Sequence, residues 1–152
     1  MTPAIEVRNV EKVFRQSTGM FSAPRMVRAV DGVSFAVPQG GCFGIVGESG
    51  CGKSTLARTL VGLQDASSGS IRYQGQELIG LSHKEWKPLR RDVQLVFQDP
   101  LGSLSPKMKV IDIVAEPLKA LRPELDAGER HARALALLER VGLGPEIAER
   151  KP

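Results

Sequence analysis

Residues 47–54 read Gly-Glu-Ser-Gly-Cys-Gly-Lys-Ser and match the pattern G-x-x-x-x-G-K-S/T. The glycines leave the backbone free of Cβ clashes, so successive N–H groups can turn toward one anion. A lysine at the end of such a loop reaches the β- and γ-phosphates of a nucleotide, and the hydroxyl that follows suits Mg²⁺. The segment predicts a phosphate-binding loop, and the positive end of the next helix adds to its field.

The residues on either side of this loop agree with that prediction. Residues 42–46 form a short apolar run that predicts a buried strand. Behind the loop, Leu56, Leu60 and Leu63 recur at helical spacing. Strand, glycine loop and helix is the context that the motif requires; the alternative is a glycine-rich turn with a surface lysine. The nucleotide-binding residues predicted from the loop are Gly47, Ser49, Gly50, Cys51, Gly52, Lys53 and Ser54.

Composition excludes several classes of protein. The 152 residues suit one ordinary domain, and no apolar run approaches the 18 residues of a membrane span. Residues 1–6 lack the basic-then-apolar order of a signal peptide, so we expect a protein of the cytoplasmic side.

Two cysteines are too few for a disulfide framework. Cys51 is either a small residue at a variable loop position or a thiol made reactive by Lys53. The net charge of +4 is spread along the chain, which argues against a nucleic-acid partner.

Periodicity predicts strands and helices around the loop. Strands are expected over 5–10, 27–37 (with a turn at Asp31-Gly32), 70–73 and 93–97, with a long hairpin loop at 16–25. Helices are expected over 83–91, over 111–121 with a kink or break at Pro117, and after Asp126. Leu135, Leu138 and Val141 should form the apolar stripe of the last helix. This order predicts an α/β nucleotide-binding core that carries a helical insertion.

Residues 96–100 (Val-Phe-Gln-Asp-Pro) and 103–106 (Ser-Leu-Ser-Pro) resemble the Q-loop of the ATP-binding cassette (ABC) transporter ATPases. Within that family they resemble the oligopeptide/dipeptide (peptide/nickel) importer branch. Segments 29–35, 47–60, 115–118 and 138–143 agree with the same family. The resemblance implies an α/β P-loop NTPase fold with an antiparallel β subdomain and an incomplete helical subdomain. It places the β subdomain and phosphate loop at about 1–98 and the Q-loop with the helical part at about 99–152.

The resemblance also implies roles for single residues. Lys53 would contact the β- and γ-phosphates and act in catalysis, Ser54 would bind Mg²⁺, and Thr55 would contact the α-phosphate. Gln98 would be the Q-loop glutamine, a catalytic residue that touches Mg²⁺ and the attacking water and passes the nucleotide state to the membrane subunits.

Two further residues and one helix carry alternative interpretations. Phe14 lies near the aromatic position that stacks on adenine, or it is a core residue at a strand end. Val30 packs beside the base and ribose, or it belongs to the core. Residues 111–121 lie where the family forms a groove for the coupling helix of the permease, and the same apolar stripe also suits the core of the subdomain.

The implied protein is the ATP-binding subunit of an importer, in which ATP binding and hydrolysis drive the transport of peptides or related small solutes. Its partners would be integral-membrane permease subunits, a second ABC ATPase subunit and, indirectly, a solute-binding protein outside the cell. It would lie on the cytoplasmic face of the membrane, with ATP and Mg²⁺ bound. The alternatives are an ABC ATPase of a non-transport complex, of the carbon–phosphorus lyase type, or a non-catalytic nucleotide-binding remnant.

The sequence departs from the family pattern at its far end. It contains no Ser-Gly-Gly-Gln segment and no Asp-Glu pair, and neither His83 nor His131 stands in the context of the family's switch histidine. We therefore expect the first half of a nucleotide-binding domain. Alone it should show little or no ATPase activity, and it should expose apolar surface at an unpaired sheet edge. Turnover equal to that of a full-length relative would contradict this expectation.

Overall fold

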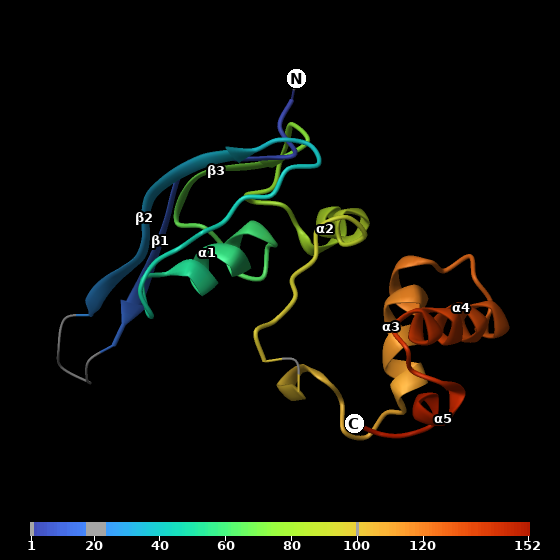
Figure 1. Cartoon of the computed structure of the whole chain (residues 1–152). Coiled ribbons are helices and arrows are strands. Elements are labelled where there is room, and N and C mark those ends of the chain that lie inside the picture. The colour runs from blue at the N-terminus through green and yellow to red at the C-terminus, as the bar shows by residue number, and fades with distance from the viewer. Residues whose placement is uncertain (1, 18–23, 100) are drawn as a thin grey trace. The chain divides into compact units, whose positions relative to one another are not determined.

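The computed structural model describes residues 2–17, 24–99 and 101–152. The chain divides into two compact units, residues 1–89 with 93–95, and residues 90–92 with 96–152. Each unit is described by itself. The elements, labelled in Figure 1 where there is room, are β1 Ile5–Gln16, β2 Arg25–Val37, α1 Lys53–Leu60, β3 Ser68–Tyr73, β4 Gln76–Glu77, α2 His83–Leu89, the 3-10 helix Leu101–Ser103, α3 Val110–Leu121, α4 Ala127–Arg140 and α5 Pro145–Ala148.

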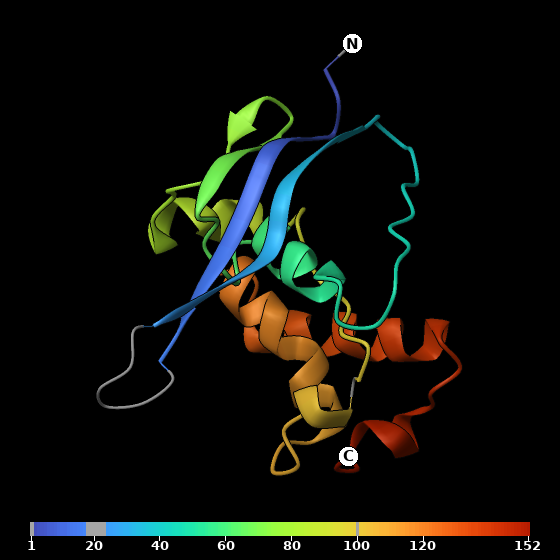
Figure 2. The ribbon, with the colours of Figure 1, turned by 90° about the vertical axis from the view of Figure 1, so that its left-hand side faces the viewer.

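The first unit is built on an antiparallel sheet of order β2-β1-β3-β4. Figure 2 shows α1 lying against this sheet. Val7, Val10 and Ile71 point from the sheet into the core and are at most 1% exposed. Leu56 of α1 and Trp86 of α2 close the core from the other side. This burial of apolar side chains between sheet and helices is the main stabilising term of the unit.

Strand β2 differs from its prediction, because it does not turn at Asp31-Gly32. The register passes from Val10↔Val33 to Lys12↔Val30, so two residues of β2 face one residue of β1. Gly32 has φ +64°, a left-handed conformation that glycine adopts without steric cost. The pattern is therefore a β-bulge within one long strand. The predicted hairpin loop at 16–25 connects β1 to β2, and its residues 18–23 lie outside the described residues.

Two predicted strands are absent from the described residues. Segments 42–46 and 93–97 are strongly apolar, yet neither pairs with a strand there. Val46 is 95% exposed and Val96 is 93% exposed. Phe43 instead stacks on Phe35, with ring centroids 4.7 Å apart. The prediction fails because a strand takes its hydrogen bonds from a neighbouring chain segment, and an apolar pattern alone cannot supply one.

The helices of the second unit pack through a small core of Ile111, Ala134, Leu138 and Ala148. Pro117 does not split α3, which runs unbroken through it. Packing of an amphipathic face contributes most of the stability of a helix in a protein, and Ile111 supplies that packing here. A backbone bond from Val110 N to Arg150 O, 2.8 Å long, ties the start of α3 to the segment after α5.

Helix α4 begins after Asp126 as predicted, and its apolar stripe differs from the prediction at one residue. Asp126 and Glu129 form a capping box, with Glu129 N donating to Asp126 Oδ1 over 2.8 Å. The predicted stripe is wrong at Val141, which is 71% exposed. Leu143 N donates to Leu138 O in a Schellman turn, which ends the helix at Arg140 and leaves Val141 outside the packed face.

Among the described residues, no helix has both the length and the apolar character needed to span a bilayer.

Glu77 joins the edge of the sheet to the loop after it. Its carboxylate accepts hydrogen bonds from Ser70 Oγ, from Ile71 N at 3.0 Å and from Ile79 N at 3.2 Å. Burial raises the pKa of Glu77, but these hydrogen bonds, with one from Arg72, outweigh burial, so the pKa lies below its ordinary value of 4.5.

A pKa that is lower in the folded chain makes stability depend on pH. The contribution of Glu77 is fully present above its unfolded pKa and is lost as pH falls through its folded pKa. We expect Glu77→Gln to lower the free energy of unfolding at about pH 7, and the difference from wild type to shrink at about pH 3. Urea unfolding at the two pH values measures this. Glu139→Gln, at an exposed position of α4, is the control, and an equal pH dependence in both variants would contradict the assignment.

Candidate functional site

The glycine-rich loop passes directly into α1, as the motif predicts. Gly52 is the N-cap of α1 with φ +99°, and Gly50 has φ +83°. Both conformations are left-handed and favour glycine. The helix then begins at Lys53, so the free N–H groups of its first turn lie beside the loop. An α-helix N-terminus carries a partial positive charge that favours an anion.

Two of the glycines stand where a Cβ would meet a neighbouring atom closely, and Gly52 is required by its backbone conformation as well. A Cβ on Gly52 would lie 1.9 Å from the carbonyl oxygen of Ala29 in β2. A Cβ on Gly47 would lie 2.7 Å from Cys51 Sγ. The loop is thus folded tightly on itself and against β2. Sequence reasoning explained these glycines by freedom of the backbone and missed the contact with Ala29, for which the local sequence carries no signal.

The ammonium group of Lys53 lies inside the loop. Its Nζ donates to the carbonyl oxygens of Gly47 and Glu48, both at 2.7 Å, and lies 3.5 Å from Cys51 Sγ. Among the residues that the structure describes, no carboxylate forms an ion pair with it. The positive charge of Lys53 is therefore held in place by neutral oxygens and is not balanced by an acidic side chain.

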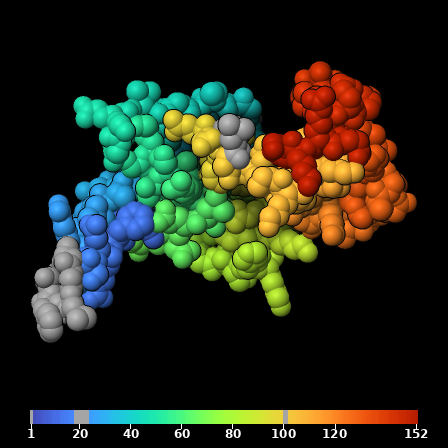
Figure 3. Space-filling view, turned by 90° about the horizontal axis from the view of Figure 1, so that it is seen from below, coloured from blue at the N-terminus to red at the C-terminus, as the bar shows by residue number. Residues whose placement is uncertain are grey.

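A cleft of about 580 Å³ lies beside this loop within the first unit. It is lined by Arg28, Ala29, Val30, Asp31, Val33, Ser34, Phe35, Phe43, Gly44, Ile45, Val46, Cys51, Gly52, Lys53 and Leu56. Apolar and aromatic side chains thus form most of its wall, and Lys53 is at its polar side. In Figure 3 the segment around residues 40–55, coloured teal to green, is open to solvent.

The predicted site residues fall into three groups. The loop from Gly47 to Thr55 is contiguous, with Ser49 and Ser54 exposed and Thr55 half-buried. Val30 lines the same cleft but is only 5% exposed and also belongs to the core. Phe14 lies on β1 outside the lining of the cleft, with 37% of its surface exposed. Gln98 is exposed and belongs to the second unit.

A polyphosphate fits this donor set better than a tightly ligated metal does. The loop offers backbone N–H groups, a helix N-terminus and an ammonium, all of which bind anions. In the described part of the chain, no three His, Cys, Asp or Glu side chains gather in a way that could hold a metal ion. Mg²⁺ commonly takes one or two protein oxygens with substrate phosphates and water, so the Ser54 hydroxyl suits a magnesium that arrives with a nucleotide.

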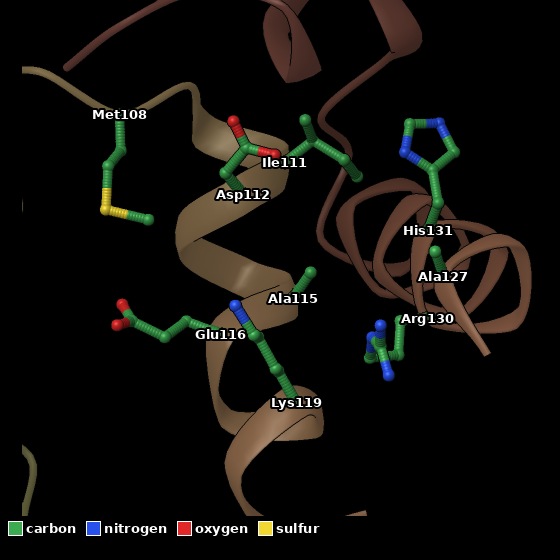
Figure 4. Close-up of a pocket in the computed structure, with 9 residues that line it drawn as sticks. All are labelled: Met108, Ile111, Asp112, Ala115, Glu116, Lys119, Ala127, Arg130 and His131. Carbon is green, nitrogen blue, oxygen red and sulfur yellow. The ribbon is translucent and has the colours of Figure 1, made fainter. Parts of the chain in front are cut away.

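A second cavity, of about 400 Å³, lies within the second unit between α3 and α4. Figure 4 shows Asp112, Glu116 and Lys119 on α3, and Arg130 and His131 on α4. Ile111 and Ala115 of α3 also line it. Ile111 belongs to the core of the second unit as well as to this lining, whereas Asp112 and Glu116 are exposed.

Known proteins of one family are similar to this chain in sequence. The model of the family described as ABC transporter matches residues 30–152. The chain is 45% identical over 141 residues to the oligopeptide transport ATP-binding protein OppF of Haemophilus influenzae, covering 93% of this chain and 42% of the relative. It is 42% identical over 152 residues to the di/tripeptide transport ATP-binding protein DppF of Pseudomonas aeruginosa, covering 100% of this chain and 47% of the relative. The chain thus spans about half the length of the curated relatives it matches.

Solved structures show the same fold. The dimeric ATP-binding cassette MJ0796, in a post-hydrolysis state bound to ADP and Pi, matches with a TM-score of 0.81 and 26% identity. The match covers 97% of this chain and 61% of the cassette chain. The predicted fold class, a P-loop NTPase with an antiparallel β subdomain and the start of a helical subdomain, is confirmed.

Proposed function

The chain belongs to the ABC transporter family. We propose that it binds the triphosphate of ATP as part of the ATP-binding subunit of a peptide importer. One observation carries the proposal: the Lys53 ammonium lies 2.7 Å from two carbonyl oxygens of the glycine loop, at the N-terminus of α1. The relatives named for oligopeptide and di/tripeptide transport support the importer role.

The loop residues have distinct roles in this proposal. The N–H groups of the loop and of the first turn of α1 bind phosphate oxygens, and Lys53 adds a full positive charge toward the β- and γ-phosphates. Ser54 holds Mg²⁺, which neutralises phosphate charge when it is bound. Thr55 contacts the α-phosphate. Phosphoryl transfer to water depends mainly on positioning and on neutralising charge, and these groups supply both.

The base and the Q-loop belong to the same proposal. Phe14 is exposed enough to stack on adenine, whereas Val30 offers only an edge beside the base because it is 5% exposed. Gln98 is proposed to contact Mg²⁺ and the attacking water, and its exposed position leaves the amide accessible. Hydrolysis itself is proposed for the whole protein, since this chain contains no Asp-Glu pair to activate water.

We further propose the partners that this function requires. These are permease subunits in the membrane, a second ABC ATPase subunit and, indirectly, an extracytoplasmic solute-binding protein, with this chain on the cytoplasmic face. No nucleic-acid partner is proposed, because the net charge of +4 is spread along the chain. The cavity between α3 and α4 suits contact with a permease segment, since its lining combines the half-buried Ala115 with charged side chains of both helices.

Calorimetric titration of the chain with ATP tests the nucleotide-binding part of the proposal. We expect binding that depends on Mg²⁺ and that weakens at least tenfold when AMP replaces ATP, because AMP lacks the β- and γ-phosphates that Lys53 reaches. Absence of magnesium-dependent ATP uptake would overturn the proposal. Equal binding of ATP and AMP would also contradict it, because the loop would then not be the recognition element.

A further inference from the structure

Strand β1 places Lys12 beside Phe14 on one face. Residues two apart on a strand point to the same side, and Val10, Lys12 and Phe14 follow this spacing. Val10 is fully buried against the core, so this face is the one that carries α1. The Lys12 ammonium lies 5.3 Å from the centroid of the Phe14 ring. This is within the range of a cation–π interaction.

Lys12 also connects β1 to the segment that follows α1. Its Nζ donates to the carbonyl oxygen of Asp65 over 2.6 Å. Two more bonds run in parallel, from Val13 N to Ser67 Oγ at 2.9 Å and from Ser67 N to Glu11 O at 2.8 Å. The end of β1 that carries Phe14 is therefore tied to residues 65–67, which follow α1.

The same part of the sheet contacts the loop directly. Gly52 packs on Ala29 of β2, the next residue of β2 is paired with Lys12, and Phe14 is two positions further along β1. Two strand positions span about 7 Å. Lys12 is thus paired with the neighbour of the residue that contacts Gly52, while its ammonium lies over the Phe14 ring.

We infer that Lys12 is a positioning residue for the adenine platform: its ammonium covers one face of the Phe14 ring and anchors that ring to Asp65. This inference rests on the proposed function, because it needs Phe14 to receive the base. The face of the ring turned away from Lys12 stays available for stacking. Lys12 acts through Phe14, so it governs affinity for the base and leaves affinity for the phosphates unchanged.

Titration with two ligands, ATP and inorganic tripolyphosphate, each with Mg²⁺, tests the inference. We expect Lys12→Met to weaken ATP binding about threefold, the effect of one exposed cation–π contact, and to leave tripolyphosphate binding unchanged. Lys12→Arg should retain ATP binding, because a guanidinium can still cover the ring and donate to Asp65. Lys84→Met, at an exposed position of α2, is the matched control and should change neither ligand. Thermal unfolding of each variant confirms that it is folded.

The outcomes separate this inference from the proposed function. If Lys12→Met weakens both ligands equally, Lys12 acts on the phosphates and the inference is overturned while nucleotide binding stands. If Lys12→Met changes neither ligand, or if Lys12→Arg fails to retain ATP binding, the inference is also overturned. If the wild-type chain binds ATP no more tightly than tripolyphosphate, Phe14 receives no base. The inference about Lys12 is then overturned as well. If the wild-type chain binds neither ligand, the proposed function itself fails.

Discussion

Replacing Gly52 by alanine is expected to destabilise the first unit by about 2–5 kcal/mol. A left-handed conformation costs a non-glycine residue about 1–2 kcal/mol, and forcing an atom into a packed region adds about 1–3 kcal/mol. Both apply here, because Gly52 has φ +99° and its Cβ would lie 1.9 Å from the backbone oxygen of Ala29. Backbone cannot swing aside as a long side chain can, so the loop or β2 must shift.

Gly50→Ala separates the two terms of this prediction. Gly50 also has a left-handed φ, +83°, but a Cβ there meets nothing within 4 Å. Its cost should therefore be the conformational term alone, about 1–2 kcal/mol. Urea unfolding of the two variants and of the wild type measures the difference. Equal losses in the two variants would mean that the contact between the loop and β2 contributes nothing.

Replacing Lys53 by alanine is expected to weaken Mg²⁺-dependent ATP binding by a factor on the order of 10–100. Each hydrogen bond to a charged group contributes about 1.5–3 kcal/mol, and the ammonium is proposed to contact two phosphates. The variant also loses the bonds to Gly47 O and Glu48 O, which hold the ammonium in the loop without any ligand. Calorimetry with ATP measures the affinity.

The control for this variant is Lys84→Ala, which removes an exposed lysine from α2 in the same unit. It changes the net charge by the same amount, so a general electrostatic effect would appear in both variants. The unfolding temperature of Lys53→Ala shows whether the chain remains folded. Unchanged ATP affinity in a folded Lys53→Ala chain would rule out the loop as the phosphate site.

Local signals in the sequence were sufficient for the starts of α2 and α4. Ser82 with Glu85, and Asp126 with Glu129, form the caps that their spacing predicts. Each cap joins residues only three positions apart, so the sequence contains both partners side by side. The phosphate loop is the same kind of signal, since Lys53 bonds to residues five and six positions before it.

Other features were decided only by tertiary structure. The apolar segment at 42–46 was predicted as a buried strand, yet Val46 is almost fully exposed because no described segment pairs with it. The turn predicted at Gly32 is a bulge, since the register with β1 sets the path of β2 there. A strand is defined by a partner that is distant in sequence, and its residue pattern does not reveal whether that partner is present.

The sequence by itself determined the phosphate loop, the helix that follows it and the caps, because their bonds join residues within one or two turns of chain. The tertiary structure alone decided that Gly52 must fit against Ala29 and that Lys12 lies between Phe14 and Asp65. Lys12 and Asp65 are 53 positions apart. Contacts over such separations arise only when the sheet and α1 pack together, which no local pattern encodes.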